Sequence, residues 1–503
     1  MTRASRSFAH WRPLPLDFEV CYRAVCSRDA RFDGQFFTAV TSTSIYCRPS
    51  CPAPTPKAVH VRFYGSAAAA AADGFRACRR CRPEASPGSP EWNIRADLVA
   101  RALRLISEGI IDIAGVAGLA QRLAVSERHL HRELMTEVGV GPLTLARTRR
   151  AQTARLLMDE TDLPLTEIAF AAGFNSLRQF NETMLSTFGC PPTALRRRGR
   201  TEHLGGGGLT VRLQYRPPFD AEALLAFLGQ RALPGVEEVG TGRYRRTVAL
   251  PRSTGIVELE PNSAAQEIVV RLWLTDLRDV SLLVQRCRHL LDLDTEPTPI
   301  AGHLSADPLL AALVARRPGL RVPGTLNGFE LAVRAILGQQ VSIAGARTLV
   351  GRLVQALGDP LSRPVDTLTH LFPSPERVAQ ANLQVLGLTA HRATALHVLA
   401  ERVATGAIVL DRGADREQTI SQLLAVPGIG PWTAAYIAMR ALGDPDAFPA
   451  TDLGLHHALK RGGYALSPRG LAAQAEAWRP WRSYAVMHLW TNLTDQRETR
   501  LAS

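Results

Sequence analysis

Two close pairs of cysteines stand in the first part of the chain. Cys47 and Cys51 are separated by three residues, Cys78 and Cys81 by two, and 26 residues lie between the pairs. Pairs of this kind on separate loops can close a tetrahedral site in which four thiolates bind Zn²⁺. The spacing predicts one zinc ion bound by Cys47, Cys51, Cys78 and Cys81. A purely structural zinc, holding a core too small to fold alone, is the plainer alternative to a reactive site.

Six of the eight cysteines lie in the first 81 residues. In a chain without a secretion signal, this clustering indicates metal binding or reactive thiols and not disulfides. The cysteines outside the two pairs are expected to be small buried thiols. They are Cys21, Cys26, Cys190 and Cys287.

A second group that could do chemistry lies near the C-terminus. The turn Pro427-Gly428-Ile429-Gly430 stands between two helical patterns, where Gly428 and Gly430 can direct backbone N–H groups toward one DNA phosphate. The turn alone is weak evidence because many loops contain it. The helix that starts near Pro431 ends before the chain reaches Asp452. This carboxylate could act in catalysis, or it could simply be the N-cap of a helix over residues 453–460.

The charge balance favours nucleic acid as the partner. The 503 residues include 59 Lys and Arg against 46 Asp and Glu, a net charge of +13. Such a surplus suits phosphate contacts, whereas a genome rich in G and C would explain only the preference for arginine over lysine. Long apolar runs and a signal-peptide core are absent from the sequence. We therefore expect a cytoplasmic protein without membrane contact.

Breaks in composition divide the chain into several parts. Its length is roughly three to four times that of a typical domain. The Pro/Ser/Gly-rich residues 83–90 and the glycine run within residues 199–208 predict linkers. The predicted fold is multidomain, mainly α with α+β parts. Its segments are a small zinc domain (1–85), a double helix-turn-helix (92–200), a linker (201–208), an α+β layer (209–300) and a helix-hairpin-helix domain (301–503).

Hydrophobic periodicity indicates the elements that position these groups. Two helix-turn-helix patterns cover residues 116–142 and 165–192. Alternating apolar residues from Leu209 to Tyr215 predict a strand. Further strands near 243–250, 254–259 and 267–274, with helices over 221–231 and 278–292, complete the α+β layer. From about residue 305 the pattern is helical.

The cysteine-rich segment resembles a known repair domain. Phe36–Cys51, with its Cys47-Arg-Pro-Ser-Cys51 element, and Gly74–Pro83 resemble the N-terminal domain of the Ada methylphosphotriester-DNA methyltransferases over residues 17–84. The resemblance implies that Cys47 accepts a methyl group from a DNA phosphate. It also implies DNA-backbone contacts by Thr43, Arg76 and Arg80. The Pro-Cys-His-Arg element of that family's second acceptor is absent, so transfer from phosphotriesters alone is expected.

Residues 92–198 resemble the DNA-binding domain of AraC-type regulators. The resemblance rests on Ala172-Gly-Phe-Asn-Ser176, Phe180, Phe188-Gly189 and Pro192. It implies two recognition segments, over about 127–137 and 176–187, whose polar faces read DNA. The candidate contacts are Arg128, His131, Arg132, Ser176, Arg178, Gln179 and Asn181. The alternative is that both motifs are only helical packing units.

Residues 209–495 resemble the AlkA-type 3-methyladenine DNA glycosylases. The resemblance rests on Arg317–Pro323, Asn327–Ser342 and Trp478–Trp490. It implies that Asp452 is the catalytic carboxylate and that Trp432, Tyr436 and Trp490 line the base pocket, although each aromatic could be ordinary core. Gln340 replaces the leucine with which that family fills the gap left by a flipped base. Trp432 also replaces the Schiff-base lysine of lyase-type relatives, so strand cleavage by that route is not expected.

Together these resemblances predict a protein of alkylation damage repair and regulation. It would combine a zinc-thiolate methyl acceptor, a promoter-binding module and a monofunctional glycosylase, with double-stranded DNA as its partner and RNA polymerase as a further candidate. The alternative is a transcription factor whose zinc is structural and whose C-terminal region binds DNA without catalysis.

Overall fold

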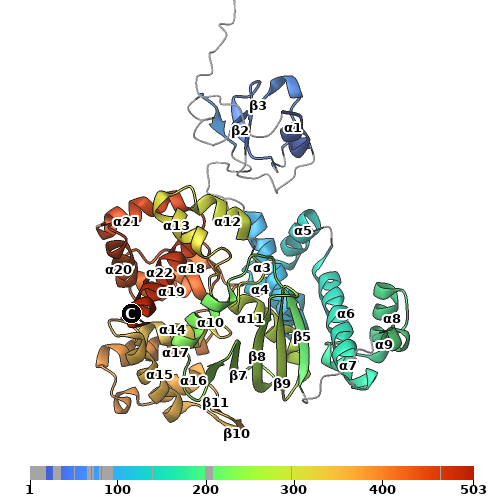
Figure 1. Ribbon diagram of the computed structural model, residues 1–503. Coiled ribbons are helices and arrows are strands. Elements are labelled where there is room, and N and C mark those ends of the chain that lie inside the picture. Colours follow the sequence, from blue (N-terminus) through green and yellow to red (C-terminus); the bar gives the residue numbers. More distant parts are fainter. Residues whose placement is uncertain are drawn as a thin grey trace, which may run out of the picture. The chain divides into compact units, whose positions relative to one another are not determined.

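The computed structural model describes residues 18–26, 36–49, 51, 53–64, 70, 73–78, 81, 94–138, 140–161, 163–198, 208–295, 297–464 and 466–502. The chain divides into two compact units, residues 1–98 and 99–503. The predicted linkers over 83–90 and 201–208 lie outside the described residues, except for Gly208. In Figure 1 the first unit is drawn in blue and the second runs from light blue to red.

The described residues of the first unit form a small sheet, a helix and a 3-10 turn. The helix is α1 (Phe18–Cys26), and η2 (Ala58–His60) is a single 3-10 turn. The strands, in the spatial order β3-β1-β2-β4, are β3 (Val61–Tyr64), β1 (Phe37–Val40), β2 (Ile45–Cys47) and β4 (Arg76–Ala77). Its apolar residues form two small clusters, one around Tyr46 and one around Phe63. Cores of this size seldom stabilise a domain alone, which fits a domain that needs a metal.

The second unit begins with seven helices. Serine side chains cap both predicted recognition helices, because Ser126 Oγ accepts a hydrogen bond from His129 N and Ser176 Oγ from Gln179 N, each at 3.2 Å. The two predicted helix-turn-helix motifs are therefore present. The helices are α3 (Ile94–Glu108), α4 (Ile110–Arg122), α5 (Glu127–Glu137), α6 (Pro142–Glu160), α7 (Leu165–Ala171), α8 (Leu177–Phe188) and α9 (Pro192–Arg198).

The predicted α+β layer is an antiparallel sheet of five strands in the order β5-β9-β8-β7-β6. Two helices, α10 (Ala221–Gln230) and α11 (Val280–Leu290), accompany it, and η3 (Leu277–Asp279) precedes α11. The strand β6 was not predicted, because its four residues are too few to show alternation. The strands are β5 (Leu209–Gln214), β6 (Glu237–Gly240), β7 (Arg243–Ala249), β8 (Thr254–Asn262) and β9 (Glu267–Leu274).

The C-terminal part is helical, as predicted, with one exception. A two-stranded hairpin, β10 (Pro360–Val365) and β11 (Leu368–His370), interrupts the helices. The strands are short and largely exposed, so they carry little periodic signal. The helices are α12 (Pro297–Leu304), α13 (Pro308–Arg316), α14 (Gly328–Leu337), α15 (Ile343–Leu357), α16 (Pro375–Gln380), η4 (Leu383–Leu386), α17 (Ala390–Ala404), α18 (Arg416–Leu424), α19 (Pro431–Arg440), α20 (Leu453–Arg461), α21 (Pro468–Gln474), η5 (Ala475–Trp478) and α22 (Arg482–Ala502).

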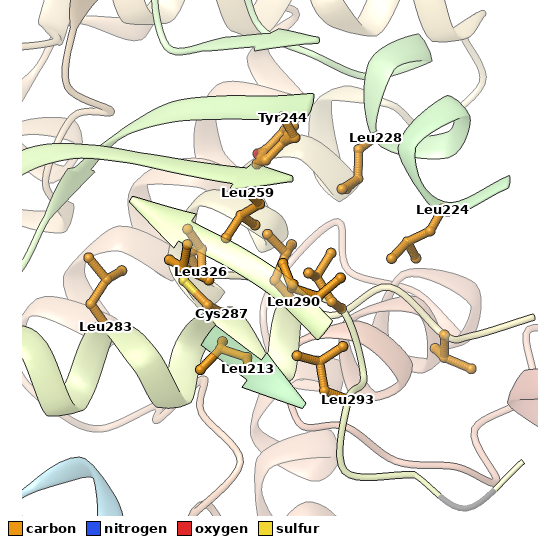
Figure 2. Close-up of a cluster of buried hydrophobic side chains, with 14 of the residues drawn as sticks. Leu213, Leu224, Leu228, Tyr244, Leu259, Leu283, Cys287, Leu290, Leu293 and Leu326 are labelled. Atoms are coloured by element: carbon orange, nitrogen blue, oxygen red, sulfur yellow. The ribbon is translucent and has the colours of Figure 1, made fainter. Parts of the chain in front are cut away.

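Two large apolar cores hold the second unit. One joins the sheet to α11–α13 and α20–α22 and also includes residues of α6–α9; the other lies among α14–α19. Figure 2 shows part of the first core, where Cys287 lies among leucines of the sheet and of α11. Cys287 and Cys21 are buried as predicted, and Cys190 is partly exposed. The prediction is wrong for Cys26, which is exposed at the last residue of the short helix α1.

Candidate functional sites

Asp452 is held by three N–H groups. Its Oδ1 accepts hydrogen bonds from Leu455 N and from Trp490 Nε1, both at 2.9 Å. Its Oδ2 accepts from Trp432 Nε1 at 2.8 Å. The residue is the N-cap of α20, and its side chain remains partly exposed. The two interpretations of this residue are thus compatible, because the capping bond fixes a carboxylate that still reaches the surface.

The three predicted pocket aromatics form one group around that carboxylate. The Trp432 and Tyr436 rings stack, with centroids 5.5 Å apart and planes 14° apart. The Tyr436 and Trp490 rings are tilted by 48° at 6.1 Å. Tyr436 packs on one of the two large cores and Trp490 on the other. All three are partly exposed, so the group lies where the two cores meet and reaches the surface.

Two arginines, the buried Arg440 and the partly buried Arg231, adjoin Tyr436 and were not singled out from the sequence. Arg440 Nη1 donates to Tyr436 Oη at 2.7 Å, and the Arg440 guanidinium also donates to two backbone carbonyls. The guanidinium carbon of Arg231, the C-cap residue of α10, lies 3.7 Å from the Phe227 ring centroid, and burial lowers the Arg231 pKa to about 10. Burial raises the pKa of Tyr436, but Arg440 and Arg231 outweigh this, and the pKa lies below its ordinary value.

Only one of these arginines left a sequence signal. Arg440 follows Tyr436 by four residues on the same helix, which places both on one face. Arg231 lies about two hundred residues earlier, on a helix of the α+β layer. No local pattern connects it with Tyr436.

The glycine turn has the geometry expected of a tight hairpin. Gly428 has φ +88°, and a Cβ at this position would lie 3.0 Å from both Ala395 Cβ and His391 Nε2. Gly430 is the N-cap of α19, and a Cβ at this position would meet no atom within 4 Å. The first turn of a helix carries N–H groups without intrahelical partners, so the turn can approach a phosphate.

Gln340 lies at the tip of a loop beside this turn. The side chain of its neighbour Gln339 donates from Nε2 to Gly428 O at 2.9 Å and to Thr433 Oγ1 at 2.8 Å. Gln340 itself is exposed and has a left-handed backbone with φ +55°. The next residue, Val341, is also exposed, at 37%. An amide and an apolar side chain therefore share the tip.

The four paired cysteines form one cluster in the first unit. All four Sγ atoms lie within 4.8 Å of one another, and Cys51 Sγ and Cys78 Sγ are 3.9 Å apart. Sulfurs that bind one zinc ion tetrahedrally are about 3.8 Å apart. Four thiolates this close require a cation, and Zn²⁺ fits.

Exposure separates Cys47 from the other three cysteines. Cys51, Cys78 and Cys81 are at most 8% exposed, whereas Cys47, at the end of β2, is partly exposed. Thr43, in the turn before β2, and Arg76, on the neighbouring strand β4, are both exposed. Arg80 lies outside the described residues.

The recognition helices expose the predicted polar side chains. Arg128 is exposed in the first turn of α5. The Arg178 side chain is 88% exposed in the first turn of α8, where it forms a 2.8 Å ion pair with Glu182. Leu130, Leu134 and Phe180 are buried, as core positions should be.

Four family models match consecutive parts of the chain. They are the metal binding domain of Ada (20–84), a helix-turn-helix domain (119–198), the AlkA N-terminal domain (210–327) and the HhH-GPD superfamily of base excision DNA repair proteins (333–483). The Mycobacterium tuberculosis protein named probable bifunctional transcriptional activator/DNA repair enzyme AlkA is 51% identical over 481 residues, 95% of this chain and 97% of that protein. The chain therefore belongs to the family of bifunctional transcriptional activator/DNA repair enzymes that this protein represents.

Members of narrower families match parts of the chain. Escherichia coli DNA-3-methyladenine glycosylase 2 is 36% identical over 55% of this chain and 95% of its own length. Escherichia coli Ada, a bifunctional transcriptional activator/DNA repair enzyme, is 32% identical over 38% of this chain and 50% of its own length. This chain shares its fold with a solved structure, the 3-methyladenine DNA glycosylase from Archaeoglobus fulgidus. The TM-score is 0.51 and the identity 24%, and the match covers 56% of this chain and 98% of the Archaeoglobus chain.

These matches confirm the predicted multidomain fold and the zinc cofactor of this bifunctional family. The metal-binding family model covers all four clustered cysteines, which accommodate one zinc ion. Among the described residues, none of the helices has the length and apolar character needed to cross a membrane.

Proposed function

We propose that residues 209–503 hydrolyse the N-glycosidic bond of alkylated purines such as 3-methyladenine. The observation that carries this proposal is the Asp452 carboxylate, fixed by the indole N–H groups of Trp432 and Trp490 at the edge of an open aromatic group. The name of the Escherichia coli glycosylase relative supports the class of substrate.

The arrangement suits a cationic base. A purine alkylated at N3 or N7 is positively charged, so its glycosidic bond is already weakened and its departure needs little acid catalysis. The faces of Trp432, Tyr436 and Trp490 favour a cation over a neutral base by about 0.5–2 kcal/mol for each good contact. Asp452 stabilises the positive charge that develops on the sugar and orients the attacking water.

The hairpin and the neighbouring loop would hold the DNA during base flipping. Gly428 and Gly430 bring the backbone of the turn close to one phosphate. Gln340, at the loop tip, fills the gap that the flipped nucleotide leaves. The Gln339 hydrogen bonds to Gly428 and Thr433 keep the two DNA contacts in register.

Product analysis with the full chain tests the glycosylase proposal. A duplex carrying one 7-methylguanine is incubated with excess protein, and the products are separated by chromatography and on a denaturing gel. We expect free 7-methylguanine and an unbroken strand with an abasic site, because Trp432 offers no amine for strand cleavage. An intact base after many hours contradicts the proposal, and a nicked strand contradicts its monofunctional form.

For residues 1–85 we propose stoichiometric methyl transfer. The Cys47 sulfur forms a bond to the methyl carbon of a methylphosphotriester, the carbon–oxygen bond breaks, and the DNA phosphate regains its negative charge. The exposure of Cys47 among buried cysteines supports this choice. Bound zinc keeps the cysteine sulfurs deprotonated at neutral pH. Because a thioether is a poor leaving group, each protein molecule reacts once. Thr43, Arg76 and Arg80 would hold the DNA backbone.

Intact-mass spectrometry separates this proposal from a transcription factor with a structural zinc. After exposure to methylated DNA, the wild-type chain should gain the mass of one methyl group, and Cys47→Ala should gain none. Zinc analysis controls for loss of the fold, since three ligands remain in the variant. An unchanged wild-type mass, or methyl uptake by Cys47→Ala, contradicts the assignment.

For residues 92–200 we propose promoter binding through α5 and α8. The exposed Arg128 and Arg178 are the contacts whose loss should weaken binding most. Activation would require contact with RNA polymerase, and a protein with these partners belongs at the nucleoid in the cytoplasm. A gel-shift series with Arg128→Ala and Arg178→Ala tests the binding, and unchanged affinity in both variants contradicts it.

A further inference from the structure

A short turn marks the start of the helix that leads into the glycine hairpin. Asp411 Oδ1 accepts from Gly413 N at 2.9 Å, and its carbonyl accepts from Ala414 N at 3.1 Å. Asp415 is the N-cap of α18, with Oδ1 accepting from Gln418 N at 3.0 Å. Residues 411–415, here called the hairpin-entry turn, therefore fix where α18 begins.

Few residues of α18 itself are buried, and its other side-chain bonds are long: Arg416 Nη2 donates to Gly443 O at 3.5 Å and Arg402 Nη1 donates to Gln422 O at 3.4 Å. Only Thr419 and Leu423 are buried among its nine residues. The following helix α19, by contrast, buries six of its ten residues. The contacts of the hairpin-entry turn are therefore a substantial part of what holds α18, and the Gly428 turn at its far end, in position.

The hairpin-entry turn is held by α3, the helix that precedes the helix-turn-helix pair. Arg101 Nε donates to Gly413 O at 2.9 Å, and Arg101 Nη1 donates to Asp415 Oδ2 at 3.3 Å. The Arg101 side chain is only 10% exposed. Arg104 Nε donates to Arg412 O at 3.0 Å. A planar guanidinium that donates to a carbonyl and to a carboxylate at once restricts both the position and the orientation of the turn that carries them.

Close packing accompanies these bonds. A Cβ on Gly413 would lie 2.5 Å from Leu105 Cδ2 and 2.7 Å from Leu105 Cγ, so only glycine permits this approach. Arg122, at the end of α4, forms an ion pair with Asp411. Both α3 and the first helix of the first helix-turn-helix motif therefore contact the hairpin-entry turn.

A second contact joins α3 and α6 to the α+β layer. Residues of α6 belong to the same core as the strand β5. Thr153 Oγ1, on α6, donates to Ser281 Oγ at 3.4 Å. Ser281 Oγ donates to Ser107 O, at the end of α3, at 3.5 Å. The DNA-binding module is thus attached to the glycosylase module at two separate places.

We propose that α3 supports the DNA-binding hairpin of the glycosylase, and that Arg101 and Arg104 are positioning residues for this hairpin. The proposal rests on the glycosylase function proposed above. Neither residue is needed at the reacting atoms. Their loss would loosen α18 and the phosphate-binding turn, while Asp452 and its aromatic neighbours, carried by α19, α22 and the start of α20, stay in place. The effect should therefore fall on KM for damaged DNA and not on kcat.

Steady-state kinetics of the full chain tests this inference, with a 7-methylguanine duplex as substrate. For Arg101→Ala we expect KM to rise by about fivefold or more while kcat stays within about twofold. Arg101→Lys keeps the charge but can make only one of the two contacts, so it should fall between. Arg155→Ala is the control, because Arg155 pairs with Asp159 on its own helix, away from the hairpin-entry turn. An unchanged KM in Arg101→Ala, or an equal rise in Arg155→Ala, overturns the inference.

Hydrogen exchange gives a readout that does not depend on catalysis. In Arg101→Ala, amides of residues 416–424 should exchange faster than in the wild-type chain, while those of 431–440 keep their protection. Unchanged exchange over 416–424 contradicts the inference. A wild-type chain that releases no base contradicts the glycosylase proposal instead, so the two failures are distinguishable.

Discussion

Trp432 Nε1 donates a hydrogen bond to Asp452 Oδ2 at 2.8 Å, although twenty residues separate them in the chain. The indole stands in the first turn of α19 and the carboxylate caps α20, so the bond joins the hairpin's second helix to the helix that carries the reacting group. One side chain thereby contributes an aromatic face to the pocket and a donor to the carboxylate.

The two roles of Trp432 can be separated by Trp432→Phe. The phenyl ring keeps most of the aromatic face but leaves Oδ2 without its donor. We expect the single-turnover rate of base release to fall by about tenfold, the cost of one hydrogen bond to a charged group, while DNA affinity is kept. Trp490→Phe removes the matching donor to Oδ1 and should behave alike. Wild-type rates in both variants would show that the orientation of Asp452 does not depend on these bonds.

A substitution of Gln340 should improve the binding of damaged DNA. Gln340→Leu places an apolar group at the loop tip, which fills the gap in a base stack better than an amide does. We expect a KM for damaged duplex several-fold lower than wild type, with little change in stability, because glutamine already occupies this left-handed position. Gln340→Asn keeps an amide and tolerates that backbone, so it serves as the control. A KM raised by Gln340→Leu would mean that the amide makes a specific contact with DNA.

The pKa of Glu108 predicts a pH dependence of stability. Burial, followed by the nearby Asp411, raises the pKa of the Glu108 carboxyl to about 7 from its ordinary 4.5. Arg286, Arg122 and Arg412 oppose the rise without cancelling it. Because the folded-state pKa is the higher one, this group's contribution is complete below pH 4.5 and is lost as the pH rises through 7.

Urea unfolding at pH 5 and pH 8 measures this effect. Glu108→Gln should flatten the decline in the free energy of unfolding between the two pH values by about 1–3 kcal/mol. The exposed Glu401, with Glu401→Gln, is the control. A decline of wild-type size in Glu108→Gln would assign the titration to another group.

Methylation of Cys47 should act as a charge switch. Four thiolates around Zn²⁺ carry a net charge of two minus, and a thioether in place of one thiolate leaves one minus. The methylated protein should therefore bind promoter DNA more tightly, with a difference that shrinks as salt rises. Fluorescence anisotropy at low and high salt checks both parts. Equal affinities at low salt would contradict the switch.

Local pattern explains what the sequence could and could not predict. The cysteine cluster, the serine-capped recognition helices and the group of Asp452, Trp432, Tyr436 and Trp490 follow from spacing within short segments or from motifs. Arg231 and the hairpin-entry turn were missed because their partners lie far away in the chain. Arg101 and Asp415 are 314 residues apart, and only tertiary packing brings such groups together.

The most direct test of the account is base release by Asp452→Asn in the full chain. The isostere keeps the shape of the side chain and removes its charge, and its amide cannot accept from both indoles. We predict that the variant binds a 7-methylguanine duplex within a few-fold of wild type but releases the base at least about a hundredfold more slowly under single-turnover conditions. Asp446→Asn, which alters another carboxylate of the same domain, should keep its rate if it stays folded. Near-normal release by Asp452→Asn would contradict the assignment of Asp452 as the catalytic carboxylate.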